Sequence, residues 1–110
     1  MYSKNAKKPT KAEAARMARL KQMPCVAGDC TQCAIEVHHL LSGGKRRGHM
    51  FTIPLCAWHH RGVQLGGLSR TTLEHLLGPS LAHGSKPFHA AFGEDDYLLA
   101  TTNKLLGEIQ

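Results

Sequence analysis

Closely spaced cysteines and histidines are the feature that most constrains what this chain can fold into. Its 110 residues include four cysteines and eight histidines. A domain of this size buries a modest core, and such domains are often stapled by a metal or by disulfides. No apolar stretch follows the basic N-terminus, so no secretory signal is visible, and interleaved histidines favour metal ligation over disulfides. A disulfide-bonded protein is the weaker alternative.

The candidate structural metal site centres on Cys56-Ala-Trp-His59. A Cys-x2-His step puts a thiolate and an imidazole on one side of a tight turn, as in a zinc knuckle. Cys30 together with either Cys25 or Cys33 would complete a Cys3His zinc site, and the spacing does not choose between those two. The alternative is that these cysteines are small buried hydrophobic residues.

A second candidate group comprises His38, His39 and His60. Neighbouring residues point to opposite sides of a strand and are rotated by about 100° on a helix, so His60 would face away from a metal held by His59. One member of the 38/39 pair could then bind a divalent cation with His60. The other could act as a general base, because an imidazole has an ordinary pKa of about 6.5. The alternative is a purely structural histidine cluster.

The charge balance favours a polyanion as partner, because 14 Lys and Arg outnumber 8 Asp and Glu to give a formal charge of +6. Only six residues are aromatic, which argues against a base-stacking platform. No apolar run approaches 18 residues, so no membrane span is expected. These features indicate a nucleic-acid partner rather than a membrane.

Residues 1–22 are expected to form a basic arm that is disordered or helical. Thr10-Lys-Ala-Glu13 fits a capping box, but few large apolar residues follow it, so a helix here would have little to bury. The arm is either a solubilising tail or a segment that lies along phosphates. Half of the basic residues of the chain are in this arm: Lys4, Lys7, Lys8, Lys11, Arg16, Arg19 and Lys21.

The remaining residues, 23–110, are expected to form one small α+β domain. Strands are predicted at 34–38 and 51–55, with a glycine-rich basic loop at 42–48 between them. A helix is predicted from about residue 57 to the glycines at 66–67. A further capping box at 71–74, an irregular stretch at 79–93 and a last helix from about 94–96 complete the expected order. The last helix carries one apolar stripe: Leu98, Leu99, Leu105, Leu106 and Ile109.

Three segments carry a resemblance to a known family: 38–49, 51–62 and 78–89. The order Glu-Val-His-His, loop, strand, Leu-Cys-x-x-His-His resembles the HNH (ββα-metal) nucleases. All three segments are similar to the phage-borne recombination-enhancement nucleases, and the similarity covers about residues 23–95. The resemblance implies a ββα-metal core stapled by zinc, with added C-terminal helices. It also implies a RecA-dependent DNA endonuclease in the cytoplasm of a bacterial host, with DNA and RecA filaments as partners.

The resemblance assigns roles to particular residues. His39 resembles the general base, while His38 and His60 stand where the motif binds its catalytic ion, Mg²⁺ or Mn²⁺ or else Zn²⁺. Phe51 occupies the position of the usual middle Asn, so His49 or Thr52 would take the supporting role. Cys56 and His59 match the structural zinc positions. Residues expected to contact nucleic acid are Lys45, Arg46, Arg47, Arg61 and Lys86, while His83 and His89 would line the DNA path or add ligands.

Overall fold

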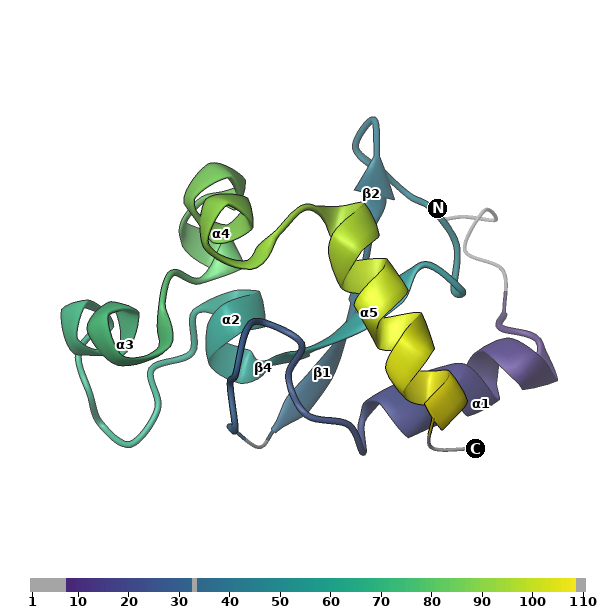
Figure 1. Cartoon of the computed structure of the whole chain (residues 1–110), viewed down its shortest axis with the longest axis horizontal. Coiled ribbons are helices and arrows are strands. Elements are labelled where there is room, and N and C mark those ends of the chain that lie inside the picture. Colours follow the sequence, from purple (N-terminus) through teal and green to yellow (C-terminus); the bar gives the residue numbers. More distant parts are fainter. Residues whose placement is uncertain (1–7, 33, 109–110) are drawn as a thin grey trace.

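The computed structural model describes residues 8–32 and 34–108 and shows a small α+β protein, as the sequence predicted (Figure 1). Short strands lie at the centre and five α-helices surround them. In chain order the elements are α1 (Lys11–Leu20), β1 (Ile35–His39), β2 (Leu41–Ser42), β3 (Lys45–Arg46), β4 (Thr52–Cys56), α2 (Ala57–Arg61), α3 (Arg70–Leu77), the 3-10 turn η1 (Leu81–His83), α4 (Ser85–Phe92) and α5 (Asp95–Glu108).

The two long strands, β1 and β4, pair antiparallel from Ile35 opposite Cys56 to His39 opposite Thr52. β4 leads directly into α2, so the strand pair and this helix form one continuous unit. The expected basic loop is itself a hairpin of β2 and β3. Its turn residues Gly43 and Gly44 have φ of +59° and +81°, as a tight two-residue hairpin turn requires.

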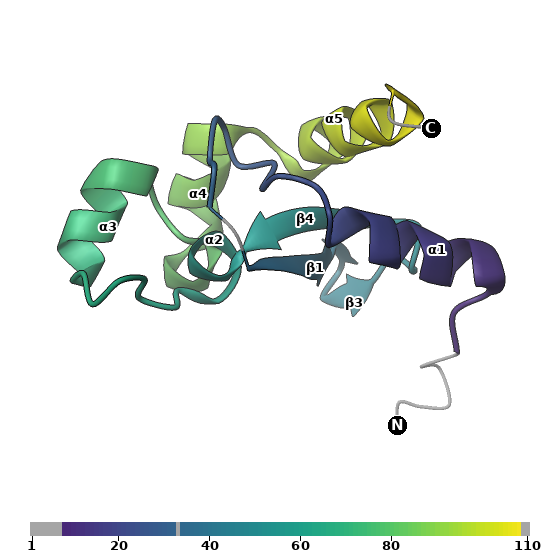
Figure 2. The ribbon, with the colours of Figure 1, turned by 90° about the horizontal axis from the view of Figure 1, so that it is seen from below.

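The core lies on both faces of β4, all five residues of which are buried. Its large members include Trp58, Phe88, Leu55, Leu73 and Leu98, each at most 2% exposed. A strand covered on both faces reads as continuously apolar rather than alternating, which explains the Ile-Pro-Leu run in β4. Figure 2 shows α5 on one side of the strand pair, with α3 and α4 beyond the end where α2 begins.

The N-terminal helix α1 forms with the predicted capping box between Thr10 and Glu13. It buries more than its composition suggested, because Leu20 at its end packs with Met23 and with Leu106 of α5. Few apolar residues suffice here, since they are concentrated where the two helices meet. α1 therefore lies against the strand pair and α5 (Figure 1).

Three expectations about the helices were wrong. α2 ends at Arg61 instead of residues 66–67, because Gly62 takes a left-handed conformation with φ +71°. α3 is capped by Ser69, whose side chain accepts from Thr72 N, so the capping box at 71–74 does not form. Residues 85–92 form α4 instead of an irregular stretch, and Pro87 is tolerated because it lies in the first turn. No helix within 8–32 and 34–108 is long and apolar enough to cross a membrane.

Candidate metal and catalytic centre

Four side chains meet beneath the start of α2 and form a Cys3His group: Cys25, Cys30, Cys56 and His59, with their ligand atoms all within 4.8 Å of one another. His59 Nδ1 lies 3.4 Å from Cys25 Sγ and 3.3 Å from Cys56 Sγ, and the Sγ atoms of Cys30 and Cys56 are 3.8 Å apart. Cys33, the alternative ligand, lies outside the described residues. This group could hold a metal such as zinc.

Two of the four side chains in the Cys3His group, His59 and Cys56, are in a protonation state that suits a cation. His59 Nε2 is 2.8 Å from the carbonyl oxygen of Leu77, so Nε2 carries the proton and the lone pair of Nδ1 faces the sulfurs. Hydrogen bonds from Cys25 and from the backbone N–H of His59 lower the pKa of Cys56 to about 4. The hydrogen bond with Cys56 and burial raise the pKa of Cys25, while burial raises that of Cys30. A thiolate is thus already favoured at one ligand.

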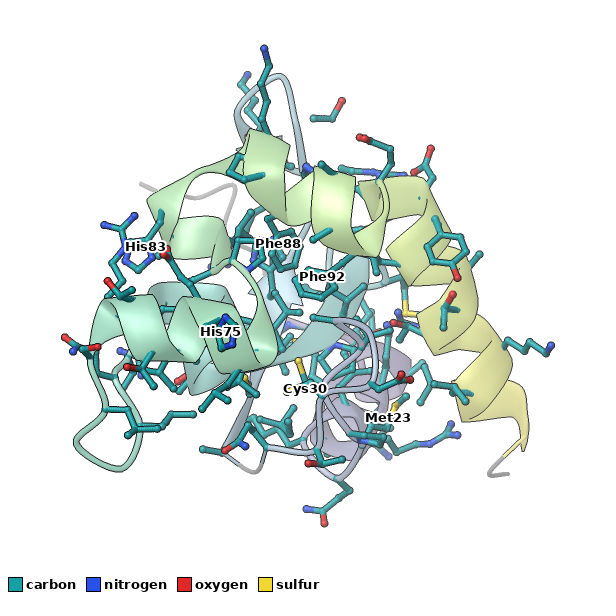
Figure 3. The ribbon with its side chains drawn as sticks, turned by 60° about the vertical axis from the view of Figure 1, so that its left-hand side comes forward. Met23, Cys30, His75, His83, Phe88 and Phe92 are labelled. Carbon is teal, nitrogen blue, oxygen red and sulfur yellow. The ribbon has the colours of Figure 1, made fainter. Side chains whose placement is uncertain are left out.

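Local structure brings these ligands together. Cys56 caps the N-terminus of α2 and accepts from the backbone N–H of His59. The loop that carries Cys25 and Cys30 is tied to β4 by a hydrogen bond from Val26 N to the carbonyl of residue 54. On the other side, Phe92 packs edge-on against His59 at 5.0 Å and also contacts Phe88. Figure 3 shows the rings of Phe88 and Phe92 next to each other, with Cys30 below them in that view. Cys25, Cys56 and His59 are buried, whereas Cys30 is partly exposed.

A second cluster forms where β1 ends, outside the Cys3His group. The rings of His38 and His60 lie edge to face with centroids 5.0 Å apart. The neighbouring ring of His39 turns to a different partner, because its Nε2 is hydrogen-bonded to Nδ1 of His49 at 3.1 Å. Among the described residues, His38 and His60 belong to no group of three or more candidate ligands.

Glu36 is a residue of this cluster whose role the sequence analysis missed. Its Oε1 accepts from Nδ1 of His60 at 2.8 Å, and both of its oxygens accept from Arg61, at 2.8 and 2.6 Å. The guanidinium of Arg61, followed by His60, lowers the pKa of Glu36 to about 2. The spacing Glu36-x-His38, which puts both residues on one face of a strand, was the available signal. Arg61, expected to contact nucleic acid, is engaged with this carboxylate.

Both histidines at the end of β1 are neutral at neutral pH. Burial, followed by the nearby His60, lowers the pKa of His38 to about 4. Burial, followed by the positive charge of Arg46, lowers that of His39 to about 4. A neutral imidazole offers a lone pair to a cation or to a proton. An approaching phosphate would raise the pKa of His39, since an opposite charge favours the protonated ring.

The histidines of the third segment have separate environments. His89 of α4 is bonded through Nε2 to Asp95 Oδ1 at 2.8 Å, and both residues act electrostatically on His38. His83 instead packs edge-on against Trp58 at 5.5 Å and lies on the α3 side of the molecule (Figure 3). His89 is therefore close to the strand-end cluster, whereas His83 belongs to the packing around α2. Lys86 is exposed on α4.

The basic residues of the hairpin next to the cluster differ in exposure and in their partners. Lys45 and Arg46 are exposed on β3. Arg47 is held by a 3.0 Å ion pair with Asp96 and by stacking over the ring of Phe51, 4.7 Å from its centroid. Exposed cations beside a histidine cluster are suited to phosphate oxygens.

These features define a small α+β protein with a largely buried Cys3His group and a separate histidine cluster at a strand end. A family model described as "Recombination enhancement, RecA-dependent nuclease" matches residues 9–107, which include both groups. The chain belongs to this family, and the part of the sequence resemblance that concerned RecA-dependent nucleases is confirmed. No curated protein matches the chain.

Proposed function

We propose that this chain is a metal-dependent DNA endonuclease of the HNH type that acts with RecA filaments in phage or prophage recombination. Family membership supports nuclease activity and dependence on RecA. The β1–β4 pair leading into α2, with a Cys3His group beneath it, supports a ββα-metal core. The observation that carries the proposal is the divergence of His38 and His39, because one ring meets His60 and the other meets His49.

His39 is the general base in this proposal. When His39 Nε2–H donates to Nδ1 of His49, the lone pair of His39 remains on Nδ1, where it can take a proton from water. His49 then stabilises the imidazolium that forms. Thr52 is less suited to this supporting role, because it is fully buried and its hydroxyl is bonded to Arg16 and to the His49 carbonyl.

His38 and His60 hold the catalytic ion in this proposal. Because His60 donates Nδ1–H to Glu36, its Nε2 carries the free lone pair, and the neutral ring of His38 lies beside it. A divalent cation bound there, Mg²⁺ or Mn²⁺ or else Zn²⁺, would stabilise the leaving 3′ oxygen and the phosphate charge. His38, His60 and His49 thus have catalytic roles beside His39.

DNA is held, in this proposal, by cations around the cluster. Lys45, Arg46 and Arg47 on the hairpin grip phosphates near the scissile bond, and Lys86 extends the path along α4. Arg61 contributes the outer N–H groups that Glu36 does not occupy. Direct reading of base sequence is not part of the proposal.

The competing function is a zinc-stapled DNA-binding module without catalysis. The full chain, loaded with zinc, is incubated with supercoiled plasmid and with RecA-coated single strands plus plasmid, in Mg²⁺, Mn²⁺ or Zn²⁺. The proposal predicts nicking that requires a divalent ion and increases with RecA. Salt-dependent DNA binding with no cleavage under any of these conditions would favour the competing function.

A further inference from the structure

Arg16 stands apart from the other basic residues of the N-terminal segment because its guanidinium is buried. The residue is 8% exposed although it lies on α1. Nε donates to Thr52 Oγ1 at 2.9 Å, Nη2 to the Thr52 carbonyl at 2.7 Å and Nη1 to Asn103 Oδ1 at 2.8 Å. Three directed bonds in a buried site leave this cation no access to phosphates. Its contacts lead instead toward the histidine cluster.

Thr52 is the link between Arg16 and that cluster. A hydroxyl can both accept hydrogen bonds and donate one. Arg16 donates to the Thr52 oxygen, so the single hydroxyl hydrogen of Thr52 is used to donate to another acceptor. It donates to the carbonyl of His49 at 3.0 Å. The same turn is closed by a hydrogen bond from Phe51 N to the carbonyl of Gly48 at 3.1 Å. The backbone of His49 is thus fixed at the carbonyl by a charge-assisted chain of hydrogen bonds.

We propose that Arg16 is a positioning residue for the His39–His49 imidazole pair. Arg16 orients the Thr52 hydroxyl, and this hydroxyl fixes the backbone carbonyl of His49. The fixed backbone in turn places the His49 ring within hydrogen-bonding distance of His39. Because Thr52 also pairs with His39 across the β1–β4 ladder, the same residue fixes both sides of the ring-to-ring bond. The inference rests on the proposed function for its catalytic meaning, and it makes α1 part of the catalytic unit.

The test compares Arg16→Met with Arg19→Met in the zinc-loaded full chain. Arg19 is a matched control, because it also lies on α1 and donates to a carbonyl of α5, that of Leu106, without contacting Thr52. The first readout is nuclear magnetic resonance of the imidazole nitrogens, which detects scalar coupling across the His39–His49 hydrogen bond. Arg16→Met is expected to lose this coupling, and Arg19→Met to keep it.

Thr52→Val provides a second route to the same result, since it removes the hydroxyl at nearly constant volume. It is expected to lose the ring-to-ring coupling as well, and it decides the question if Arg16→Met does not fold. In nicking assays, both variants are expected to lower kcat about 10- to 100-fold with KM near the wild-type value, because a misplaced base affects the chemical step. The double variant should be no worse than either single variant, since both act through one chain of contacts.

Retention of the coupling in Arg16→Met, or in Thr52→Val where that variant decides, would overturn the positioning role. This outcome differs from a failure of the proposed function. If the wild-type chain does not cut DNA but Arg16→Met still loses the coupling, the positioning role holds and the nuclease proposal fails. If the coupling persists while His39→Ala abolishes nicking, the nuclease proposal holds and the role of Arg16 is wrong.

Discussion

The imidazole of His60 and the carboxylate of Glu36 are joined by a 2.8 Å hydrogen bond from Nδ1 to Oε1. This bond fixes the His60 tautomer and leaves the Nε2 lone pair on the opposite edge of the ring. Arg61 donates two hydrogen bonds to the same carboxylate, from Nε to Oε1 and from Nη2 to Oε2, and these bonds fix its orientation. His59 belongs to the Cys3His group, whereas its sequence neighbour His60 belongs to the histidine cluster at the end of β1.

Replacement of Glu36 by Gln should weaken binding of a divalent ion at His60. The amide accepts a hydrogen bond but has no charge to raise the basicity of the ring, and such losses weaken metal affinity about 10- to 100-fold. Calorimetric titration of the zinc-loaded chain with Mn²⁺ measures the effect. Glu74→Gln on α3 is the control, since Glu74 pairs with Arg70. Equal Mn²⁺ affinity in Glu36→Gln and the wild type would contradict the assignment of His60.

Removal of metal from the Cys3His group should destabilise the protein strongly, because a small core depends on the cross-link. Thermal unfolding before and after exhaustive chelation measures this, and an unchanged Tm would show that the group is not a structural zinc site. Cys25→Ser should lose the bound zinc, whereas Cys33→Ser should keep one zinc per chain. The metal content of the two variants discriminates between the ligand sets that the sequence left open.

Stability should fall as the pH is lowered from about 6.5 toward 4, partly because of His38. Its pKa is lowered to about 4 in the folded protein, so the unfolded chain binds more protons in this window and acid favours unfolding. Urea unfolding of the zinc-loaded chain at pH 7.5 and 5.5 measures the slope. His38→Gln should reduce the loss by about 1 kcal/mol, and His75→Gln, at an exposed position, is the control. An identical slope in all three proteins would refute the prediction.

The hairpin cations should contribute to DNA affinity through counterion release. Lys45→Ala and Arg46→Ala are each expected to reduce the slope of log K against log salt by about 1. Arg70→Ala is the control, because Arg70 is paired with Glu74 on α3. Fluorescence anisotropy with duplex DNA at several salt concentrations gives the slopes. If Arg70→Ala changed the slope as much as Arg46→Ala, the binding face would not be the hairpin.

Local patterns in the sequence predicted much of this architecture. The capping box at Thr10, the strand that precedes Cys56 and the Cys-x2-His step are features of a few adjacent residues, and each is present in the structure. The start of α5 at Asp95 also follows from local charge, since acidic residues favour a helix N-terminus.

The relationships that the sequence could not predict are those set by tertiary packing. Glu36 and His60 are separated by 24 positions in the sequence, and Arg16 and Thr52 by 36. At such separations the sequence pattern does not indicate which side chains will contact one another. Likewise, α4 forms in a stretch that contains Pro87 and glycines, because Phe88 is buried in the core. Helix propensity is a weak guide when burial of one side chain decides the outcome.

The most direct test of the account is the single-turnover nicking rate of His39→Ala at saturating DNA, beside the wild type and His75→Ala. General-base catalysis typically contributes 10²- to 10⁴-fold, so we expect nicking by His39→Ala to fall by at least about 100-fold. DNA affinity and zinc content should stay unchanged, and His75→Ala should cut like the wild type. Full nicking by His39→Ala in Mg²⁺ would remove His39 from the chemistry and contradict the account.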